Sequence, residues 1–314
     1  KIKIMDLKVS DIGEKELVRY IVDNCRDIVF DDAAITPISQ NKELISTSDM
    51  LIQSKHFPKN MSYFQMGFKA VTVNVSDLAA MGARPLGFLL SIAIPKDILV
   101  SDFKQIIEGV LKACKFYNIP LIGGDTNEAD EIIISGTALG LNEKNTSLRK
   151  DGYSKGDLIC ITGEIGLAAL GFNLDDDSVY VKKALEPVAK PHEGIILKEN
   201  GATSATDITD GLASELYEIF KDSYGMMIYE ERIPISEEYK KIAKSLNLNY
   251  LDLILHVGED FELLFTISEE KLELIKDKLD FIVIGEINDS GKIEITLNSG
   301  KVCEISSKGY NHFK

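Results

Sequence analysis

The sequence lacks a hydrophobic segment long enough to cross a bilayer. Its longest nearly apolar run, residues 86–94, is interrupted by a glycine and a serine, whereas a spanning helix needs about 20 apolar residues. From residue 1 the chain also passes directly into charged sequence, without the apolar stretch and small-residue cleavage site of a secretory leader. We therefore expect a cytoplasmic protein that does not associate with membranes.

Cysteine is scarce, and its positions form no recognisable motif. Cys25, Cys114, Cys160 and Cys303 lie far apart in the sequence, whereas zinc ligands and redox pairs occur at short spacings. We expect four reduced thiols, which is the usual state of cysteine in the cytoplasm.

Positive charge is also in deficit. The 314 residues include 35 Lys and Arg against 50 Asp and Glu, which gives a net charge of −15. A protein this acidic repels a phosphate backbone, so we expect no nucleic-acid partner. Anionic small molecules would need metal ions to bind to such a surface.

Several common catalytic motifs are absent. The sequence has no G-x-x-x-x-G-K-[ST] and no G-x-G-x-x-G, so we expect neither a P-loop nor a Rossmann dinucleotide site. It also has no G-x-S-x-G and no H-E-x-x-H, which argues against the nucleophile elbow of the α/β-hydrolases and against a zinc-protease helix.

The residues that are present predict a folded two-domain protein. Hydrophobic residues make up 45% of the chain and charged residues 27%, and the length favours two domains. Helical and strand-like apolar patterns are mixed along the chain, which predicts an α/β or α+β fold. Residues 142–157 are polar and without apolar periodicity, so we expect one domain at residues 1–145 and a second at residues 146–314.

The pattern also predicts individual elements. We expect helices at residues 12–25, 66–81, 103–117, 211–221 and 269–279, and the start of another at residues 167–172. We expect strands at residues 44–46, 86–94, 119–122, 131–140, 158–162, 261–267 and 281–284.

Carboxylates are frequent at the ends of these apolar elements. They lie in six short segments, at residues 31–32, 47–49, 76–77, 123–126, 207–211 and 258–260. A single aspartate of this kind is most simply a turn residue or a helix N-cap. Six together favour a shared site, because like charges brought close need cations between them. Mg²⁺ suits such a site, since it is usually held by a few carboxylates and substrate phosphates.

Two further features are suited to a phosphate ligand. Gly123 and Gly124 allow backbone N–H groups to approach phosphate oxygens closely. Arg149 has the planar guanidinium that clamps a phosphate through two hydrogen bonds. Taken alone, however, this arginine is explained equally well as a solvated surface residue.

Five segments of the sequence resemble the thiamine-monophosphate kinase family. They are GFKAVTVNVSDLAAMGARP at residues 67–85, GGDT at residues 123–126, DITDG at residues 207–211, GEDFELLF at residues 258–265 and KGYNHF at residues 308–313. The matches follow the family order and cover essentially the whole chain. The family belongs to a superfamily of ATP-dependent enzymes that includes aminoimidazole ribonucleotide synthetase.

The resemblance implies an architecture and an activity. It implies two α/β domains, with the N-terminal sheets of two subunits joined into one barrel, and therefore a homodimer. It also implies an enzyme that transfers the γ-phosphate of ATP to thiamine monophosphate, giving thiamine diphosphate and ADP with the help of several Mg²⁺ ions.

The resemblance further implies a set of site residues. The family's metal ligands fall on Asp32, Thr47, Ser48, Asp49, Asp77, Asp125, Asp207 and Asp210. Its nucleotide contacts fall on Gly123, Gly124, Asp125, Arg149 and Thr209, and the residues expected to support catalysis are Asp125, Asp210 and Arg149. Its contacts to the vitamin substrate fall on His56, Glu259 and Tyr310. The sequence departs from the family at Phe30, usually a glycine, and at residues 53–55, which read Gln-Ser-Lys before His56.

The expected chemistry needs little acid or base catalysis. A phosphate monoester has a second pKa near 6 and is already mostly a dianion at pH 7, so we expect direct in-line transfer without a phosphoenzyme. Two alternatives stay open. One is another ATP-dependent reaction of the same superfamily, and the other is a noncatalytic sensor of nucleotide and metal.

Overall fold

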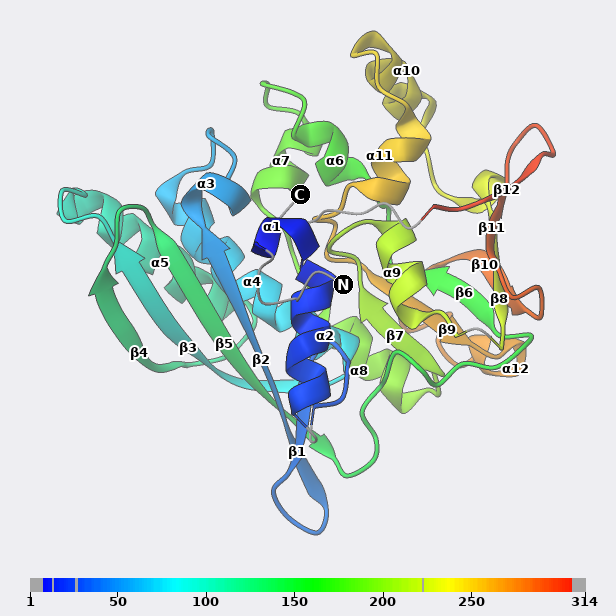
Figure 1. Cartoon of the computed structure of the whole chain (residues 1–314), viewed down its shortest axis with the longest axis horizontal. Coiled ribbons are helices and arrows are strands. Elements are labelled where there is room, and N and C mark those ends of the chain that lie inside the picture. Colours follow the sequence, from blue (N-terminus) through cyan, green and yellow to red (C-terminus); the bar gives the residue numbers. More distant parts are fainter. Residues whose placement is uncertain (1–7, 13, 26–27, 222, 307–314) are drawn as a thin grey trace.

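The computed structural model describes residues 8–12, 14–25, 28–221 and 223–306. It contains two β-sheets, one in each half of the chain (Figure 1). Its helices and strands in the first half are α1 (Val9–Ile12), α2 (Glu14–Asn24), β1 (Ala34–Pro37), β2 (Lys42–Ile52), α3 (Gln53–His56), α4 (Tyr63–Ala80), β3 (Arg84–Ile94), α5 (Val100–Phe116), β4 (Leu121–Glu128) and β5 (Ile133–Glu143).

The first sheet has five strands in the order β1-β2-β5-β3-β4. Strand β5 pairs antiparallel with β2 and β3, and β4 adds to β3 in parallel at the edge. Alternate side chains of β2, β5 and β3 are buried towards α4, as in Ile45, Ile134 and Phe88. The alternation places Ser48 and Ser91 on the opposite face, where both are exposed.

Helix α4 is the central element of the molecule. It begins with a capping box between Ser62 and Gln65, and most of its residues are buried. It packs against α5 and the first sheet, and on its other side against the second half of the chain, where Gly194 lies against the carbonyl of Ala79. A glycine is required there because a Cβ would lie 2.0 Å from that oxygen.

The second sheet has seven strands in the order β12-β11-β8-β10-β6-β9-β7. The elements of this half are β6 (Leu158–Ile161), α6 (Leu167–Gly171), α7 (Val179–Leu185), α8 (Pro191–Glu199), β7 (Ser204–Asp207), α9 (Leu212–Ile219), β8 (Gly225–Tyr229), η2 (Glu230–Arg232), α10 (Glu237–Ser245), α11 (Tyr250–His256), β9 (Leu263–Ile267), α12 (Glu269–Leu272), β10 (Ile282–Asn288), β11 (Ile293–Thr296) and β12 (Val302–Glu304). Strand β7, at the sheet edge, faces α4 (Figure 1).

The mixed α/β architecture predicted from the sequence is confirmed, and three of the predicted elements differ most in length. The strand expected at residues 44–46 runs from 42 to 52, and the strand expected to end at residue 122 continues to 128. The helix expected at residues 269–279 ends at Leu272 and is followed by turns. The boundary between residues 145 and 146 stays a prediction. In the part of the chain that the structure describes, no helix is both long enough and apolar enough to span a membrane.

Candidate active site

A cavity of about 980 Å³ lies between the two halves of the chain. One wall is formed by the end of β2, by α3 and by α4. The other is formed by α6, α7 and two loops, residues 207–211 after β7 and residues 257–261 before β9. Six of the expected site residues line this cavity: Asp49, His56, Asp77, Thr209, Asp210 and Glu259.

One face of α4 forms the floor of the cavity. Lys69, Val73 and Asp77 all line it, and residues four apart in a helix lie on the same face. At 1.5 Å per residue, Lys69 and Asp77 are about 12 Å apart along the helix axis. The cavity therefore has an acidic end at Asp77 and a second polar end at Lys69.

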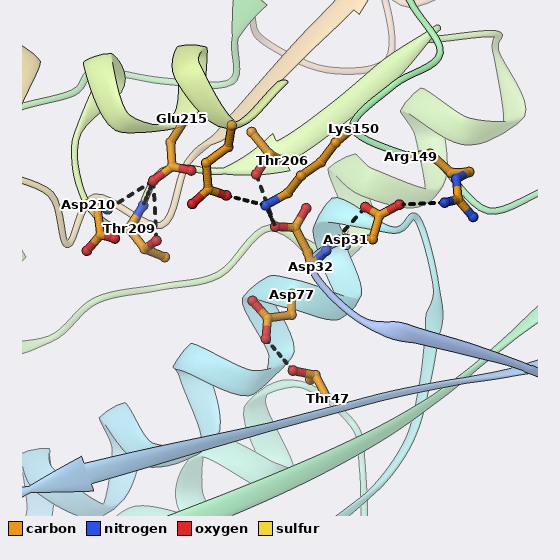
Figure 2. Close-up of polar contacts among 11 residues, drawn as sticks. Asp31, Asp32, Thr47, Asp77, Arg149, Lys150, Thr206, Thr209, Asp210 and Glu215 are labelled. Carbon is orange, nitrogen blue, oxygen red and sulfur yellow. Dashed lines mark hydrogen bonds and ion pairs between the residues drawn. The ribbon is translucent and has the colours of Figure 1, made fainter. Parts of the chain in front are cut away.

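The acidic end contains aspartates that act on one another electrostatically. Burial raises the pKa of Asp77 well above its ordinary value, and the charge of Asp49 raises it further. Burial also raises the pKa of Asp207 to about 8, with an added contribution from Asp32. Thr47 donates a hydrogen bond to Asp77 (Figure 2). Side chains from the segment before β1, from β2, from α4 and from β7 thus converge here, and their charges are close enough to oppose each other's ionisation.

Asp32 connects this cluster to a buried lysine. Lys150 forms ion pairs with Asp32, at 2.7 Å, and with Glu218. Thr206 donates a hydrogen bond to the same oxygen of Asp32 at 3.1 Å (Figure 2). Burial raises the pKa of Asp32 to about 6, against the lowering effect of Lys150. The ammonium group of Lys150 compensates part of the negative charge of the cluster.

Two oxygens of the cluster are suited to a cation. Oδ2 of Asp32 and Oδ2 of Asp207 are buried and accept no hydrogen bond, although a buried carboxylate normally has its oxygens satisfied. Among the described residues, no three His, Cys, Asp or Glu side chains stand ready around one metal position. This arrangement is compatible with Mg²⁺, which typically takes one or two protein carboxylates and completes its shell with water and phosphate oxygens.

The backbone of the loop at residues 207–211 is held by hydrogen bonds to Glu215 of α9. One oxygen of Glu215 accepts hydrogen bonds from the backbone N–H groups of Asp210, at 3.0 Å, and Thr209, at 3.3 Å (Figure 2). Burial raises the pKa of Glu215 well above its usual value, and Glu218 adds to the shift. Glu215 therefore fixes the backbone that presents Asp210 to the cavity.

The second loop is attached to the first through its backbone. The N–H of Glu259 donates to the carbonyl of Thr209 at 2.8 Å, and that of Phe261 to Ile208 at 3.0 Å. Glu259 and Phe261 have positive φ values of 70° and 53°, which non-glycine residues adopt only under constraint. A Cβ on Gly258 would lie 1.7 Å from the carbonyl of Thr209, so the approach of the loops requires glycine.

Arg149 lies at the edge of the acidic cluster. Its guanidinium is 3.4 Å from Asp31 and 3.6 Å from Asp151, and its side chain is 35% exposed. Asp31 precedes Asp32, so Arg149 is placed beside the cluster with part of its surface open to a ligand (Figure 2).

The residues expected to bind the substrate are described in part. Nδ1 of His56 lies 2.8 Å from the N–H nitrogen of Ile52 and 3.3 Å from the carbonyl oxygen of the same residue. Glu259 forms an ion pair with Lys69. Tyr310 lies outside the described residues.

Four of the expected residues lie away from the acidic cluster within this chain. Asp125, with Gly123 and Gly124, lies in the exposed edge strand β4. Three strand spacings separate β4 from β2, or about 14 Å. Ser48 points to the opposite face of the sheet, where its hydroxyl donates to the carbonyl of Gly136 at 2.9 Å and is exposed.

The sequence reasoning missed three charged residues of the site: Lys69, Lys150 and Glu215. A signal existed for Lys69, because it is a lone charge within the apolar part of the segment at residues 67–85, where a buried lysine needs a partner. Lys150 and Glu215 gave no signal, since their partners are distant in the sequence or are backbone groups.

Family models match both halves of the chain. The N-terminal domain of the AIR synthase related proteins matches residues 30–142, and their C-terminal domain matches residues 154–298. The thiamine-monophosphate kinase of Pyrococcus horikoshii is 36% identical over 98% of both chains. That of Bacillus subtilis is 33% identical, over 90% of this chain and 92% of its own.

Solved structures give the same result. The fold matches a structure described as "AaThiL complexed with AMPPCP and TMP" with a TM-score of 0.87 and 27% identity, over 98% of this chain and 99% of the other. It also matches the thiamine monophosphate kinase of Aquifex aeolicus with a TM-score of 0.81 and 27% identity, over 96% of this chain and all of the other.

Proposed function

Because the chain belongs to the AIR synthase related family and, within it, to the thiamine-monophosphate kinases, we propose that its cavity transfers the γ-phosphate of ATP to thiamine monophosphate. The products are ADP and thiamine diphosphate. The observation that carries the proposal is the charge distribution of the cavity. Interacting aspartates surround Asp77, and the lysine of the Lys69–Glu259 ion pair lies about 12 Å from Asp77 along the axis of α4.

This polarity fits the substrate. Thiamine monophosphate carries a cationic ring and an amine at one end and a phosphate at the other. Glu259 supplies a carboxylate for the amine-bearing end, and His56 lines the opposite wall of the cavity. The phosphate then lies towards Asp49 and Asp77, where the second phosphate group must arrive for transfer.

We propose that the acidic end holds Mg²⁺ through Asp32, Asp49, Asp77, Asp207 and Asp210. The unsatisfied oxygens of Asp32 and Asp207 support this assignment. When bound, Mg²⁺ neutralises the phosphate groups and holds them in line for transfer. Thr47 orients Asp77 through its hydrogen bond, and Glu215 orients the backbone of Asp210.

The remaining residues act by positioning charge. The acceptor phosphate is mostly a dianion at pH 7, so the site needs no strong general base. Arg149, which is partly exposed beside Asp31, clamps phosphate oxygens of the nucleotide. Thr209 lines the cavity in the loop after β7. The result is a single in-line transfer driven by alignment and charge neutralisation.

A coupled assay for ADP release tests the proposal with thiamine, thiamine monophosphate and an aminoimidazole ribonucleotide precursor as acceptors. Of the three acceptors, we expect only thiamine monophosphate to support ADP release. EDTA should abolish this activity, and added Mg²⁺ should restore it. Activity with another acceptor only would assign the chain to a different reaction. Binding of ATP and thiamine monophosphate without turnover would support the noncatalytic sensor.

A further inference from the structure

Lys69 is a fully buried cation in the floor of the cavity. Its side chain is 1% exposed, and its neighbours in α4 include the buried residues Met66 and Ala70. Lysine is almost never buried to this extent unless its charge is paired. The position of Lys69 therefore depends on the groups that surround its ammonium.

Two groups from different walls of the cavity bind this ammonium. Nζ of Lys69 donates to the carbonyl oxygen of His56 at 2.9 Å and forms an ion pair with Oε2 of Glu259. His56 ends α3 on one wall, whereas Glu259 lies in the loop on the other wall. Lys69 thus joins the two residues that are expected to contact the substrate.

The ion pair also fixes the direction of the Glu259 carboxylate. Oε2 has no exposed surface, while the side chain as a whole is 30% exposed. The backbone of Glu259 is already held at a positive φ by its hydrogen bond to Thr209. With backbone and one oxygen both fixed, the rest of the carboxylate is left facing the cavity.

We propose that Lys69 is a positioning residue that sets the affinity for the amine-bearing end of the substrate through Glu259 and His56. The inference rests on the proposed function and deepens it. Without Lys69 the carboxylate of Glu259 is free to rotate, and the segment that carries His56 loses a hydrogen bond to α4. Both groups must then be ordered when the substrate binds, which lowers the affinity. The acidic end, two helical turns away, is unaffected.

Kinetics of three variants test this role. We expect Lys69→Met to raise KM for thiamine monophosphate roughly 10- to 100-fold, as expected for loss of a charged hydrogen-bond partner, with kcat and KM for ATP within about threefold of the wild type. Glu259→Gln should raise the same KM. In the double variant the two effects should not multiply, because each removes the same interaction.

A matched control comes from a second ion pair, in which the carboxylate is buried and the lysine is partly buried. Lys190 pairs with Glu262 at 3.3 Å, and neither residue lines the cavity. We expect Lys190→Met to lower thermal stability about as much as Lys69→Met does and to leave KM for thiamine monophosphate unchanged. If Lys69→Met fails to fold, Lys69→Gln retains a donor for His56, and we expect it to raise the same KM.

The outcomes separate this inference from the proposed function. If the wild type neither binds nor phosphorylates thiamine monophosphate, the proposed function is wrong. If the wild type is active and the Lys69 variants leave KM for thiamine monophosphate unchanged, or lower kcat and raise KM for ATP equally, then Lys69 is only a structural residue. Effects that multiply in the double variant would likewise overturn the role through Glu259.

Discussion

At the scale of single residues, the buried aspartates make stability dependent on pH and on cations. Burial raises the pKa of Asp207 to about 8 and that of Asp32 to about 6, both from an ordinary value of 3.8. A carboxyl group with a raised pKa binds its proton more tightly in the folded than in the unfolded state. The stabilisation is therefore present at low pH and is lost as pH rises towards the folded pKa.

In EDTA, we expect the melting temperature to fall as pH rises from 6 to 8. One group titrating in this way lowers the free energy of unfolding by up to ~1.4 kcal/mol per pH unit. Asp207→Asn should flatten this dependence and abolish turnover, because it removes both a titrating group and a proposed metal ligand. Thermal melts at three pH values, with and without Mg²⁺, measure the effect.

An exposed aspartate provides the control for this experiment. Asp280 is exposed between α12 and β10 and does not line the cavity, and Asp280→Asn should leave both the melting profile and the activity unchanged. Mg²⁺ should restore stability at pH 8 in the wild type but less in Asp207→Asn. A wild-type melting temperature that rises between pH 6 and 8 in EDTA would show that the cluster does not carry the charge assigned to it.

At the scale of elements, the loops at residues 207–211 and 257–261 pack closely together and form part of one wall of the cavity. We expect Gly258→Ala to separate them, because its Cβ would lie 1.7 Å from the carbonyl of Thr209, a backbone atom that cannot move aside. Overpacking of this kind costs typically 1–3 kcal/mol. The variant should lose stability and raise KM for thiamine monophosphate, as measured by denaturant unfolding and steady-state kinetics.

Gly156→Ala is the matched control for the loop prediction. A Cβ at Gly156 meets nothing within 4 Å, although its φ of 91° disfavours alanine. This substitution should cost only the backbone strain, about 1–2 kcal/mol, and leave KM unchanged. Equal kinetics for Gly258→Ala and the wild type would mean that the contact between the loops does not shape the site.

The sequence predicted these elements better than it predicted their side-chain directions. The run at residues 66–81 identified α4, because its apolar period and the breakers Gly82 and Pro85 are local signals. The strand predicted at residues 44–46 stopped short, since the following Thr-Ser-Asp is polar. Its extension to Ile52 makes the three residues alternate, so Thr47 and Asp49 face α4 and Ser48 faces away.

The pairing of charges across the fold had no local signal. Asp32 meets Lys150 only because the segment before β1 and the segment after β5 are brought together in the fold. Glu215 is close in sequence to Thr209 and Asp210, but it binds their backbone N–H groups, which no side-chain pattern reveals. Such contacts depend on strand order and register, which the periodicity of one segment does not encode. The family resemblance named the aspartates, but not the groups that hold them.

At the scale of the whole molecule, one chain leaves part of the proposed site incomplete. Asp125 lies on the exposed edge strand β4, about 14 Å across the sheet from β2. Long exposed edge strands are usually protected by pairing or covering, and residues such as Met50 remain 58% exposed on the sheet face away from α4. These features support a homodimer in which the sheets of two subunits meet.

We predict that Asp125 acts in the active site of the partner subunit. Asp125→Asn and Asp210→Asn should each abolish turnover in homodimers. In a mixed dimer, the Asp125→Asn subunit keeps its own Asp210 and receives an intact Asp125 from its partner, so one of the two sites is complete. Random mixing of the two variants by refolding or co-expression should therefore restore about a quarter of the wild-type activity, given twofold symmetry.

The double variant gives the control for this mixing experiment. A chain with both Asp125→Asn and Asp210→Asn, mixed with wild type, leaves neither site of the mixed dimer complete, so activity should fall below the fraction of wild-type chains. If Asp125 served the cluster of its own chain, mixing the two single variants would restore nothing. A monomer in sedimentation experiments that retained full turnover would also refute the shared site, since a lone chain keeps its β4 aspartate three strands away from Asp49.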